Sequence, residues 1–258
     1  MAKKERIDVL MAEKGLAESR SQAQRLVMAG SVRVDDQIVV KASRRVDRGA
    51  VIEVLQGPPY VSRGGEKLAA ALDAFKVDVS GKVCADVGAS TGGFTDCLLQ
   101  AGAGKVYAID VGYGVLHWKL RNNPHVVVME RTNARLLETL PEDVAVVTVD
   151  ASFISLTLLL PVIQGWLLPD GDLIALIKPQ FEAGPERLGR GGVVRDEGIR
   201  RDVLYEILSA SMEMGFQLHG LHRSPLKGPK GNVEFLMWCG LVGEGYRAAD
   251  LIEPLFSP

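Results

Sequence analysis

The chain has 258 residues, of which 47% are hydrophobic and 24% are charged, and its formal net charge is -2. This length suits one large domain or a large domain with a small one, and the near-neutral balance excludes a chain that binds polyanions over its whole surface. The three cysteines lack metal or CxxC spacing, and no signal peptide or bilayer-spanning apolar stretch is seen, so we expect a cytoplasmic chain.

Charge is unevenly distributed along the chain. Residues 1–60 hold 11 Lys and Arg against 8 Asp and Glu, whereas the remaining residues hold 19 against 24. A basic head on an acidic body indicates that the head meets a polyanion. A surplus of this size also arises by ordinary scatter, so the inference depends on where the basic residues lie.

The head, residues 1–56, shows a helix followed by short strands. Ser19 begins the stretch SRSQAQRLVMAG, in which the serine caps a helix and Gly30 ends it. The apolar residues of this helix share one face, which leaves Arg25 pointing away and Arg20 at the rim. Short strands are expected at residues 31–34, 37–40 and 51–55.

This order of elements resembles the alpha-L RNA-binding module of small ribosomal proteins and pseudouridine synthases, a small α+β domain. The resemblance covers residues 5–55 and is carried by the block SRSQAQRLVMAGSVRVDDQIVVKAS. For any single arginine a solvated surface position is the simpler interpretation, but a set of cations on one surface gains by releasing counterions condensed on phosphates. We therefore expect RNA contacts from Arg20, Arg25, Lys41, Arg44, Arg45 and, beyond the head, Arg63.

The segment LQGPPYVSRGG separates the head from the rest of the chain. Two adjacent prolines next to glycine neither continue a strand nor begin a long helix, so we place a linker at residues 57–64. From 65 to 258 strands alternate with helices, which predicts a mostly parallel sheet, covered on both faces, whose last strand is antiparallel. The expected strands are 82–88, 105–110, 125–129, 144–150, 172–178, 216–224 and 232–241, and the expected helices are 64–75, 91–102, 154–167 and 199–215.

A glycine-rich turn, DVGASTGGFTD at residues 86–96, follows the first strand of this sheet and opens a helix. The dinucleotide fingerprint GxGxxG requires glycine where Ser90 stands, and an acidic turn suits the sulfonium and ammonium of S-adenosylmethionine. We expect Asp110 to bind ribose hydroxyls and Asn133 to bind the adenine edge. The alternative interpretation is that the glycine-rich turn serves only the packing of the fold. The residues expected around the cofactor are Asp86, Gly88, Ala89, Ser90, Gly92, Gly93, Phe94, Asp110, Val111, Asn133 and Asp150.

Four charged residues lie far apart in the chain but are expected at one place in the fold. Asp150 ends VAVVTVD, Lys178 ends DLIALIK, Glu234 lies inside the apolar run NVEFL, and Lys67 lies on the helix before the first strand. Ligands of such sheets bind at the carboxyl ends of the strands, so we expect the four residues to converge there. A buried carboxylate such as that of Glu234 also requires a partner.

This tetrad resembles the Lys-Asp-Lys-Glu set of FtsJ-like ribose 2'-O-methyltransferases. With the motifs YVSRGGEKLAAAL, AIDVGYGVLHWKLRNNP, VVMERTNAR, VDASFISL, IKPQFE and GNVEFL, the chain is identified as a member of the TlyA family, which joins such a domain to an alpha-L head. The resemblance implies a Rossmann-like class I methyltransferase fold and methylation of cytidine ribose in ribosomal RNA of the small or large subunit, with S-adenosylmethionine and without a metal. Ribosomal RNA or ribosomal subunits are the implied partners.

The resemblance also implies roles for the tetrad. A ribose hydroxyl is a weak nucleophile and loses its proton as it attacks, which requires a general base. We expect Lys178 to be that base, poised by Lys67 and Asp150, while Lys67 and Glu234 orient the ribose and hold Lys178. Which lysine loses its proton stays open at this point.

Other features have simpler interpretations or compete with the enzyme. We assign Tyr113 and Trp118 to the core, with stacking on a base as the alternative. Residues 178–198 form either a lid over the substrate, with Arg187, Arg190 and Arg195 in contact with phosphates, or a plain loop. Many TlyA-family members carry the label hemolysin, so a membrane-lytic protein is one alternative function, and a non-catalytic RNA-binding factor of ribosome assembly is another. A monomer or a weak dimer is expected.

Overall fold

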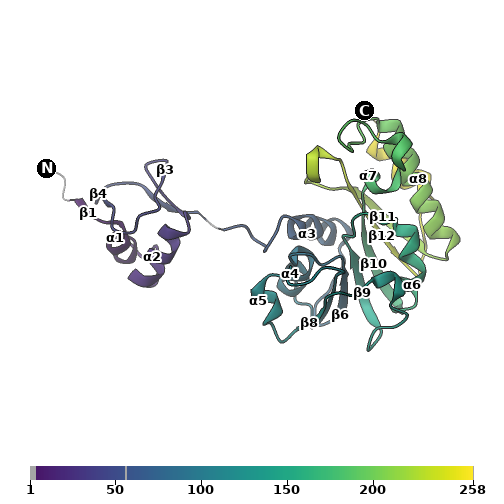
Figure 1. Cartoon of the computed structure of the whole chain (residues 1–258), viewed down its shortest axis with the longest axis horizontal. Helices are drawn as coiled ribbons and strands as arrows, with labels where there is room; N and C mark the ends of the chain where they lie inside the picture. The colour runs from purple at the N-terminus through teal and green to yellow at the C-terminus, as the bar shows by residue number, and fades with distance from the viewer. Residues whose placement is uncertain (1–3, 56, 258) are drawn as a thin grey trace. The chain divides into compact units, whose positions relative to one another are not determined.

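The computed structural model describes residues 4–55 and 57–257 (Figure 1). The chain forms two compact units, Met1–Pro59 and Tyr60–Pro258. The division falls inside the expected linker, and residues 60–64 of that segment belong to the second unit. There the Val61 N–H donates a 2.9 Å hydrogen bond to Asp96. In the described ranges no helix is both long and apolar enough to cross a membrane.

The first unit is a small α+β fold with one apolar core. Ile7, Leu10 and Met11 of the first helix pack with Ala23 and Val27 of the second, and valines of the strands complete the core. One sheet has the antiparallel order β3-β2-β5, and β1 pairs antiparallel with β4. The elements are β1 Lys4–Arg6, α1 Ile7–Glu13, α2 Arg20–Met28, β2 Val32–Val34, β3 Gln37–Ile38, β4 Arg45–Asp47 and β5 Ile52–Val54.

The helix expected after Ser19 is confirmed as α2. The Ser19 hydroxyl accepts a hydrogen bond from the N–H of Gln22, which caps the first turn. Gly30, just beyond the helix, has a φ of +73°, a conformation that glycine adopts without strain. Ala23 and Val27 are buried and Arg25 is exposed, as the apolar face of the helix requires.

A buried acid, Asp8, ties α1 to α2. Its carboxylate accepts hydrogen bonds from Arg6 at 2.9 Å, Arg20 at 3.0 Å and Gln24 at 2.8 Å. The Arg6 guanidinium is the main reason that the pKa of Asp8 is held well below its usual range. Arg20, which we expected to contact RNA, therefore also stabilises the fold of the first unit.

The second unit is built on a seven-stranded sheet in the order β11-β12-β10-β9-β6-β7-β8 (Figure 1). β12 is antiparallel to both neighbours and the other pairings are parallel, which confirms the expected sheet. The strands are β6 Val83–Val87, β7 Lys105–Ile109, β8 Val126–Met129, β9 Val144–Val149, β10 Leu167–Ile177, β11 Gln217–Arg223 and β12 Phe235–Gly240.

Alternate side chains of the strands enter two cores, one on each face of the sheet. Cys84 and Val146 pack with Leu68 of α3, whereas Ala85 packs in the core that contains Leu204 of α8. Burial on both faces explains why these strands are almost continuously apolar. The α-helices of this unit are α3 Gly64–Phe75, α4 Gly93–Gln100, α5 Trp118–Arg121, α6 Leu160–Gln164, α7 Pro179–Glu182, α8 Glu197–Glu213 and α9 Ala248–Ile252.

The expected helix at 154–167 is wrong in its extent. The segment forms a short 3-10 helix, Leu156–Leu158, and then α6, and β10 begins at Leu167. Pro161 lacks an N–H and is tolerated only in the first turn of a helix, so the segment divides in front of it. The apolar spacing alone did not show this break.

Candidate functional site

The glycine-rich turn lies over the carboxyl end of β6. Gly88 has a φ of +81°, and a side chain there would lie 2.9 to 3.0 Å from backbone atoms of Asp150 and Ala151. Only glycine fits this contact. Ser90 also has a positive φ, +49°, and its N–H donates a 2.7 Å hydrogen bond to Asp110. The turn therefore holds its backbone beside the ends of β7 and β9.

Two adjoining cavities lie at this edge of the sheet. The larger of the two, of about 370 Å³ and called the second cavity, lies at the ends of β6 and β7. Asp110 at its rim accepts the N–H groups of Ser90 and Gly112, each at 2.7 Å. Asn133 accepts the N–H of Arg135 through its oxygen, which leaves its NH2 group for a ligand. These polar groups fit the ribose and adenine of S-adenosylmethionine between walls formed by Val87, Ile109, Val111, Ala134, Ile154 and Leu159.

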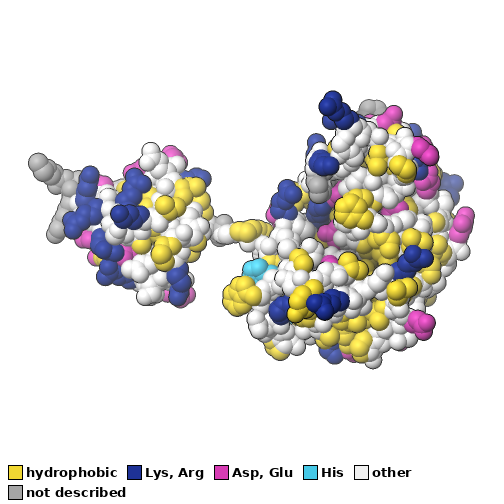
Figure 2. Space-filling view, in the orientation of Figure 1, with side chains coloured by type: hydrophobic (Ala, Val, Ile, Leu, Met, Phe, Trp, Pro, Cys, Tyr) yellow, Lys and Arg dark blue, Asp and Glu magenta, His cyan; other side chains and the backbone are white. Residues whose placement is uncertain are grey.

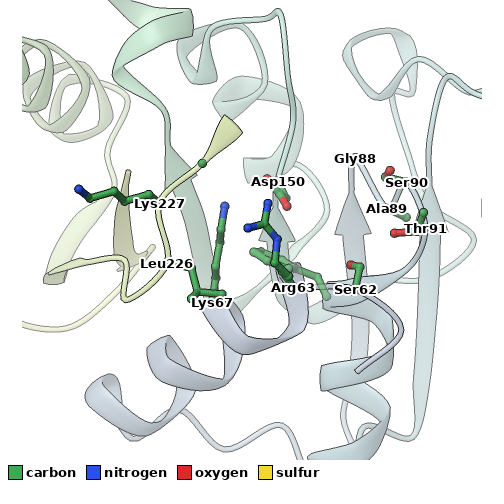
Figure 3. A pocket seen from close by; sticks show the side chains of 14 residues that line it. Ser62, Arg63, Lys67, Gly88, Ala89, Ser90, Thr91, Asp150, Leu226 and Lys227 are labelled. Carbon is green, nitrogen blue, oxygen red and sulfur yellow. The ribbon is translucent and has the colours of Figure 1, made fainter. Parts of the chain in front are cut away.

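The first cavity, of about 230 Å³, adjoins the second, because Gly88, Ser90 and Asp150 line both. Figure 3 shows Arg63 and Asp150 pointing into the same space beside the amine of Lys67. The first cavity is also lined by Ser62, Gly64, Ala89, Thr91, Gly93, Phe94, Leu226, Lys227 and Gly228. Charged groups of both signs thus meet next to the cavity that fits the nucleoside.

Two of the expected cofactor residues, Asp86 and Gly92, line neither cavity. Gly92 has a φ of +97°, and a side chain there would collide with Leu120. Asp86 is fully buried under the turn and accepts a 2.6 Å hydrogen bond from Thr95 of α4. Its expected position beside the cofactor is corrected: it joins β6 to α4. Burial raises the pKa of Asp86 to about 7.

Asp86 predicts a defined pH dependence of stability. Its carboxyl keeps a proton in the folded chain up to about pH 7, whereas the unfolded chain loses that proton near pH ~4. The folded state thus binds more protons in this window, and its contribution to stability is lost as pH rises from ~4 to ~7. We expect Asp86→Asn to flatten this slope in urea unfolding followed by fluorescence, since Trp118, Trp166 and Trp238 all lie in the second unit. Equal slopes in both proteins would contradict the assignment.

The four tetrad residues form two ion pairs at one edge of the sheet. The amine of Lys67 lies 2.5 Å from Glu234, and the amine of Lys178 lies 2.6 Å from Asp150. Lys67, Lys178 and Glu234 are buried, with 7%, 8% and 1% exposed, whereas Asp150 is partly open to both cavities. The topology thus brings together residues from α3, from the ends of β9 and β10, and from the residue before β12.

Lys178 is surrounded by oxygen acceptors. Its amine contacts the Asp150 carboxylate, the Asp150 carbonyl at 3.2 Å and the Ser152 hydroxyl at 3.0 Å. Three acceptors around one amine are the surroundings of an ammonium group, which has three donors. Ser152 was missed by the sequence analysis, although it stands directly after the strand end that we singled out.

Glu234 does not hold Lys178 as we expected. One of its oxygens accepts from Lys67, and the other accepts a 2.9 Å hydrogen bond from the side-chain amide of Gln180. Glu234 is therefore connected to Lys178 only indirectly, through Gln180, which lies two residues after Lys178 in the chain. Gln180 stands in the motif IKPQFE, but its spacing alone carries no signal for a contact with Glu234.

The basic residues expected to contact RNA lie on surfaces of both units. Arg25, Lys41, Arg44 and Arg45 are exposed on the first unit, where the last two line a hollow of about 360 Å³. Figure 2 shows Lys and Arg side chains gathered on the face of this unit that the view presents. Arg63 lines the first cavity of the second unit. Contact of this set with phosphates stays a prediction.

Two smaller expectations are corrected. Tyr113 and Trp118, assigned to the core, are 69% and 71% exposed, and the Arg131 guanidinium lies 4.1 Å from the Tyr113 ring centre. Tyr113 lies in a glycine-interrupted loop, and Trp118 is the first residue of the short helix α5. Arg187, considered for phosphate contact, instead makes two hydrogen bonds to Glu206 of α8, at 2.7 and 3.0 Å.

Two protein families match the chain, one for each unit. The FtsJ-like methyltransferase family matches residues 60–241, and the S4 domain family matches residues 5–52. With the sheet and its cavities, these matches define an S-adenosylmethionine-dependent methyltransferase that carries an S4 domain.

Known proteins are similar along nearly the whole chain. A Mycobacterium tuberculosis protein named 16S/23S rRNA (cytidine-2'-O)-methyltransferase TlyA is 46% identical, over 92% of this chain and 90% of its own length. Hemolysin A of Brachyspira hyodysenteriae is 43% identical, over 90% of this chain and 98% of its own. A solved structure from Streptococcus thermophilus is 39% identical, with a TM-score of 0.73, and the match covers 98% of this chain and 96% of that one. The chain belongs to the TlyA family.

Proposed function

We propose that this chain transfers the methyl group of S-adenosylmethionine to the 2'-hydroxyl of a cytidine in ribosomal RNA. The observation that carries the proposal is the Lys178–Asp150 pair, whose carboxylate lines both the first and the second cavity. A hydroxyl placed there adjoins a proton-accepting pair and the cavity that fits the cofactor. The TlyA relative is named for this reaction on cytidine. A ribosomal RNA substrate also places the reaction in the cytoplasm.

Lys178 takes the hydroxyl proton in this proposal. At rest its ammonium group donates to the three oxygens around it, so the reacting form is the one that has first released a proton to solvent. The resulting amine then accepts the proton of the 2'-hydroxyl as the ribose oxygen attacks. S-adenosylmethionine supplies a methyl group on a positively charged sulfur, so the remaining tasks of the chain are alignment and proton removal.

Lys67 and Glu234 position the substrate. Lys67 lines the first cavity together with Asp150 and is fixed by its ion pair with Glu234. A fixed amine beside the acceptor pair donates a hydrogen bond to an oxygen of the ribose and limits its rotation. Such alignment supplies a large part of the rate enhancement when the electrophile is already activated.

An exposed aromatic ring supports RNA as the substrate. Phe153 is 91% exposed with a φ of +62°, and its ring centre lies 4.7 Å from that of Phe181. Unpaired RNA bases stack on such rings. Phe153 follows Ser152, which contacts Lys178, so a nucleotide stacked on Phe153 has its ribose near the reacting pair. The S4 domain supplies the second argument for an RNA partner.

Methyl mapping tests the proposed function. We expect the 2'-O-methyl map of ribosomal RNA from cells with and without the gene to differ at one or a few cytidines. Purified chain should transfer a tritiated methyl group to ribosomal subunits isolated from the strain that lacks the gene. Identical maps together with no transfer would contradict the proposal. A membrane-lytic function predicts leakage of liposomes instead, which we do not expect.

A further inference from the structure

A third cavity, of about 410 Å³, lies beside the reacting pair. Ser152 and Phe153 line it on one side and also line the second cavity, and Phe181 and Gln180 of α7 lie on the other. Its remaining lining comes from Leu188, Gly191, Gly192, Lys230 and Asn232. Two aromatic rings and Leu188 lie beside four polar side chains, a combination that suits a flat ligand fixed by a small number of hydrogen bonds.

The side-chain amide of Gln180 has one possible orientation. Its nitrogen donates to Glu234 at 2.9 Å, and the other oxygen of Glu234 is occupied by Lys67. A carboxylate paired with an ammonium only accepts hydrogen bonds, so the opposite rotation of the amide would set two acceptors against each other. The group that Gln180 has left for a ligand is therefore its carbonyl oxygen, Oε1.

Within residues 4–55 and 57–257 this oxygen has no hydrogen-bond partner. Gln180 is 8% exposed, and its Oε1 is buried and accepts no hydrogen bond from any residue that the structure describes. Buried polar atoms of side chains are rarely left unpaired, and because the residue Gln180 lines the third cavity, a ligand there is the available source of a donor. The missing partner is thus a hydrogen-bond donor on the ligand of the third cavity.

We propose that Oε1 of Gln180 accepts a hydrogen bond from the exocyclic amino group of the target base and so selects cytidine over uridine. This inference rests on the proposed function. Cytosine presents an amino donor at position 4, whereas uracil presents an oxygen acceptor there, which would repel Oε1. The pairing of Lys67 with Glu234 then has a second consequence, because it sets the amide orientation that reads the base.

Gln180→Met tests the inference, because it keeps the length of the side chain and removes the amide. The measurement is the ratio of kcat/KM for subunits with cytidine at the mapped position to kcat/KM for subunits with uridine there. We expect a ratio of at least about 10 in the wild-type chain and within about twofold of 1 in Gln180→Met. Both substrates are assayed on one protein sample, so the ratio does not depend on the fraction that is folded.

Phe181→Leu is the matched control, since it alters the same cavity and keeps the amide of Gln180. We expect Phe181→Leu to lower kcat/KM for the cytidine and the uridine subunits by the same factor and so to keep the preference for cytidine. A Gln180→Met chain that retains the full preference would overturn the inference while the proposed function stands. A wild-type chain that methylates neither kind of subunit would overturn the proposed function and the inference with it.

Discussion

Lys178→Ala is expected to abolish methyl transfer and leave cofactor binding intact. Lys178 contacts Asp150 and Ser152 but lines neither the first nor the second cavity, so its loss removes the proton acceptor without opening the cofactor site. Loss of a general base lowers kcat by about 10²- to 10⁴-fold. Calorimetry with S-adenosylmethionine should give a Kd within about twofold of the wild-type value. Equal losses of binding and of transfer would contradict the role as a base.

Lys105→Ala is the control for this experiment. Lys105 also pairs with an acid, Glu142 at 2.7 Å, but it begins β7 at the amino end, whereas the tetrad lies at the carboxyl edge of the sheet. Removal of a partly exposed pair changes stability little. We expect wild-type activity in Lys105→Ala, which separates loss of an amine at the site from loss of an amine elsewhere.

Glu234→Ala is expected to cause the largest loss of stability of any single change at the site. It leaves the amine of Lys67 buried without a counter-charge and removes the acceptor of Gln180. Breaking a buried ion pair by deleting one partner costs about 3 to 5 kcal/mol. Urea unfolding followed by tryptophan fluorescence measures this loss in the second unit. A decrease below about 1 kcal/mol would contradict the buried pairing.

The double variant Lys67→Met/Glu234→Leu separates stability from activity. Replacement of both charges by apolar groups removes the unpaired ammonium, so most of the stability should return. Activity should stay lost, because the proposed positioning amine is absent. Glu244→Ala, at an exposed position, serves as the control for removal of a glutamate and should match the wild type in both measurements.

Much of the fold follows from local pattern. The apolar strands of the second unit predict a sheet covered on both faces, and Cys84 and Ala85 do enter opposite cores. Parallel strands place their carboxyl ends at one edge, so the meeting of Asp150 and Lys178 is a consequence of topology. The inward position of Asp86 was also open to prediction, because side chains two apart on a strand share a face and Cys84 is buried.

Local sequence pattern could not predict which side chains pair with each other within the site. Lys67 and Lys178 both reach the edge of the sheet, and only the path of the backbone decides that Glu234 meets the former and Asp150 the latter. The role of Gln180 depends on an amide orientation set by two other side chains. Sequence spacing carries no information on that arrangement, because the three residues come from separate segments.

The chemical identity of the methylated nucleoside tests the central claim most directly. Ribosomal subunits labelled by the purified chain with tritiated S-adenosylmethionine are digested to nucleosides and separated by chromatography. If two amine–carboxylate pairs prepare a ribose hydroxyl for attack, all of the label elutes as 2'-O-methylcytidine. Label on the ring of any base would contradict the account, because the methylated atom would then not be the ribose 2'-oxygen that Lys178 and Asp150 are proposed to activate.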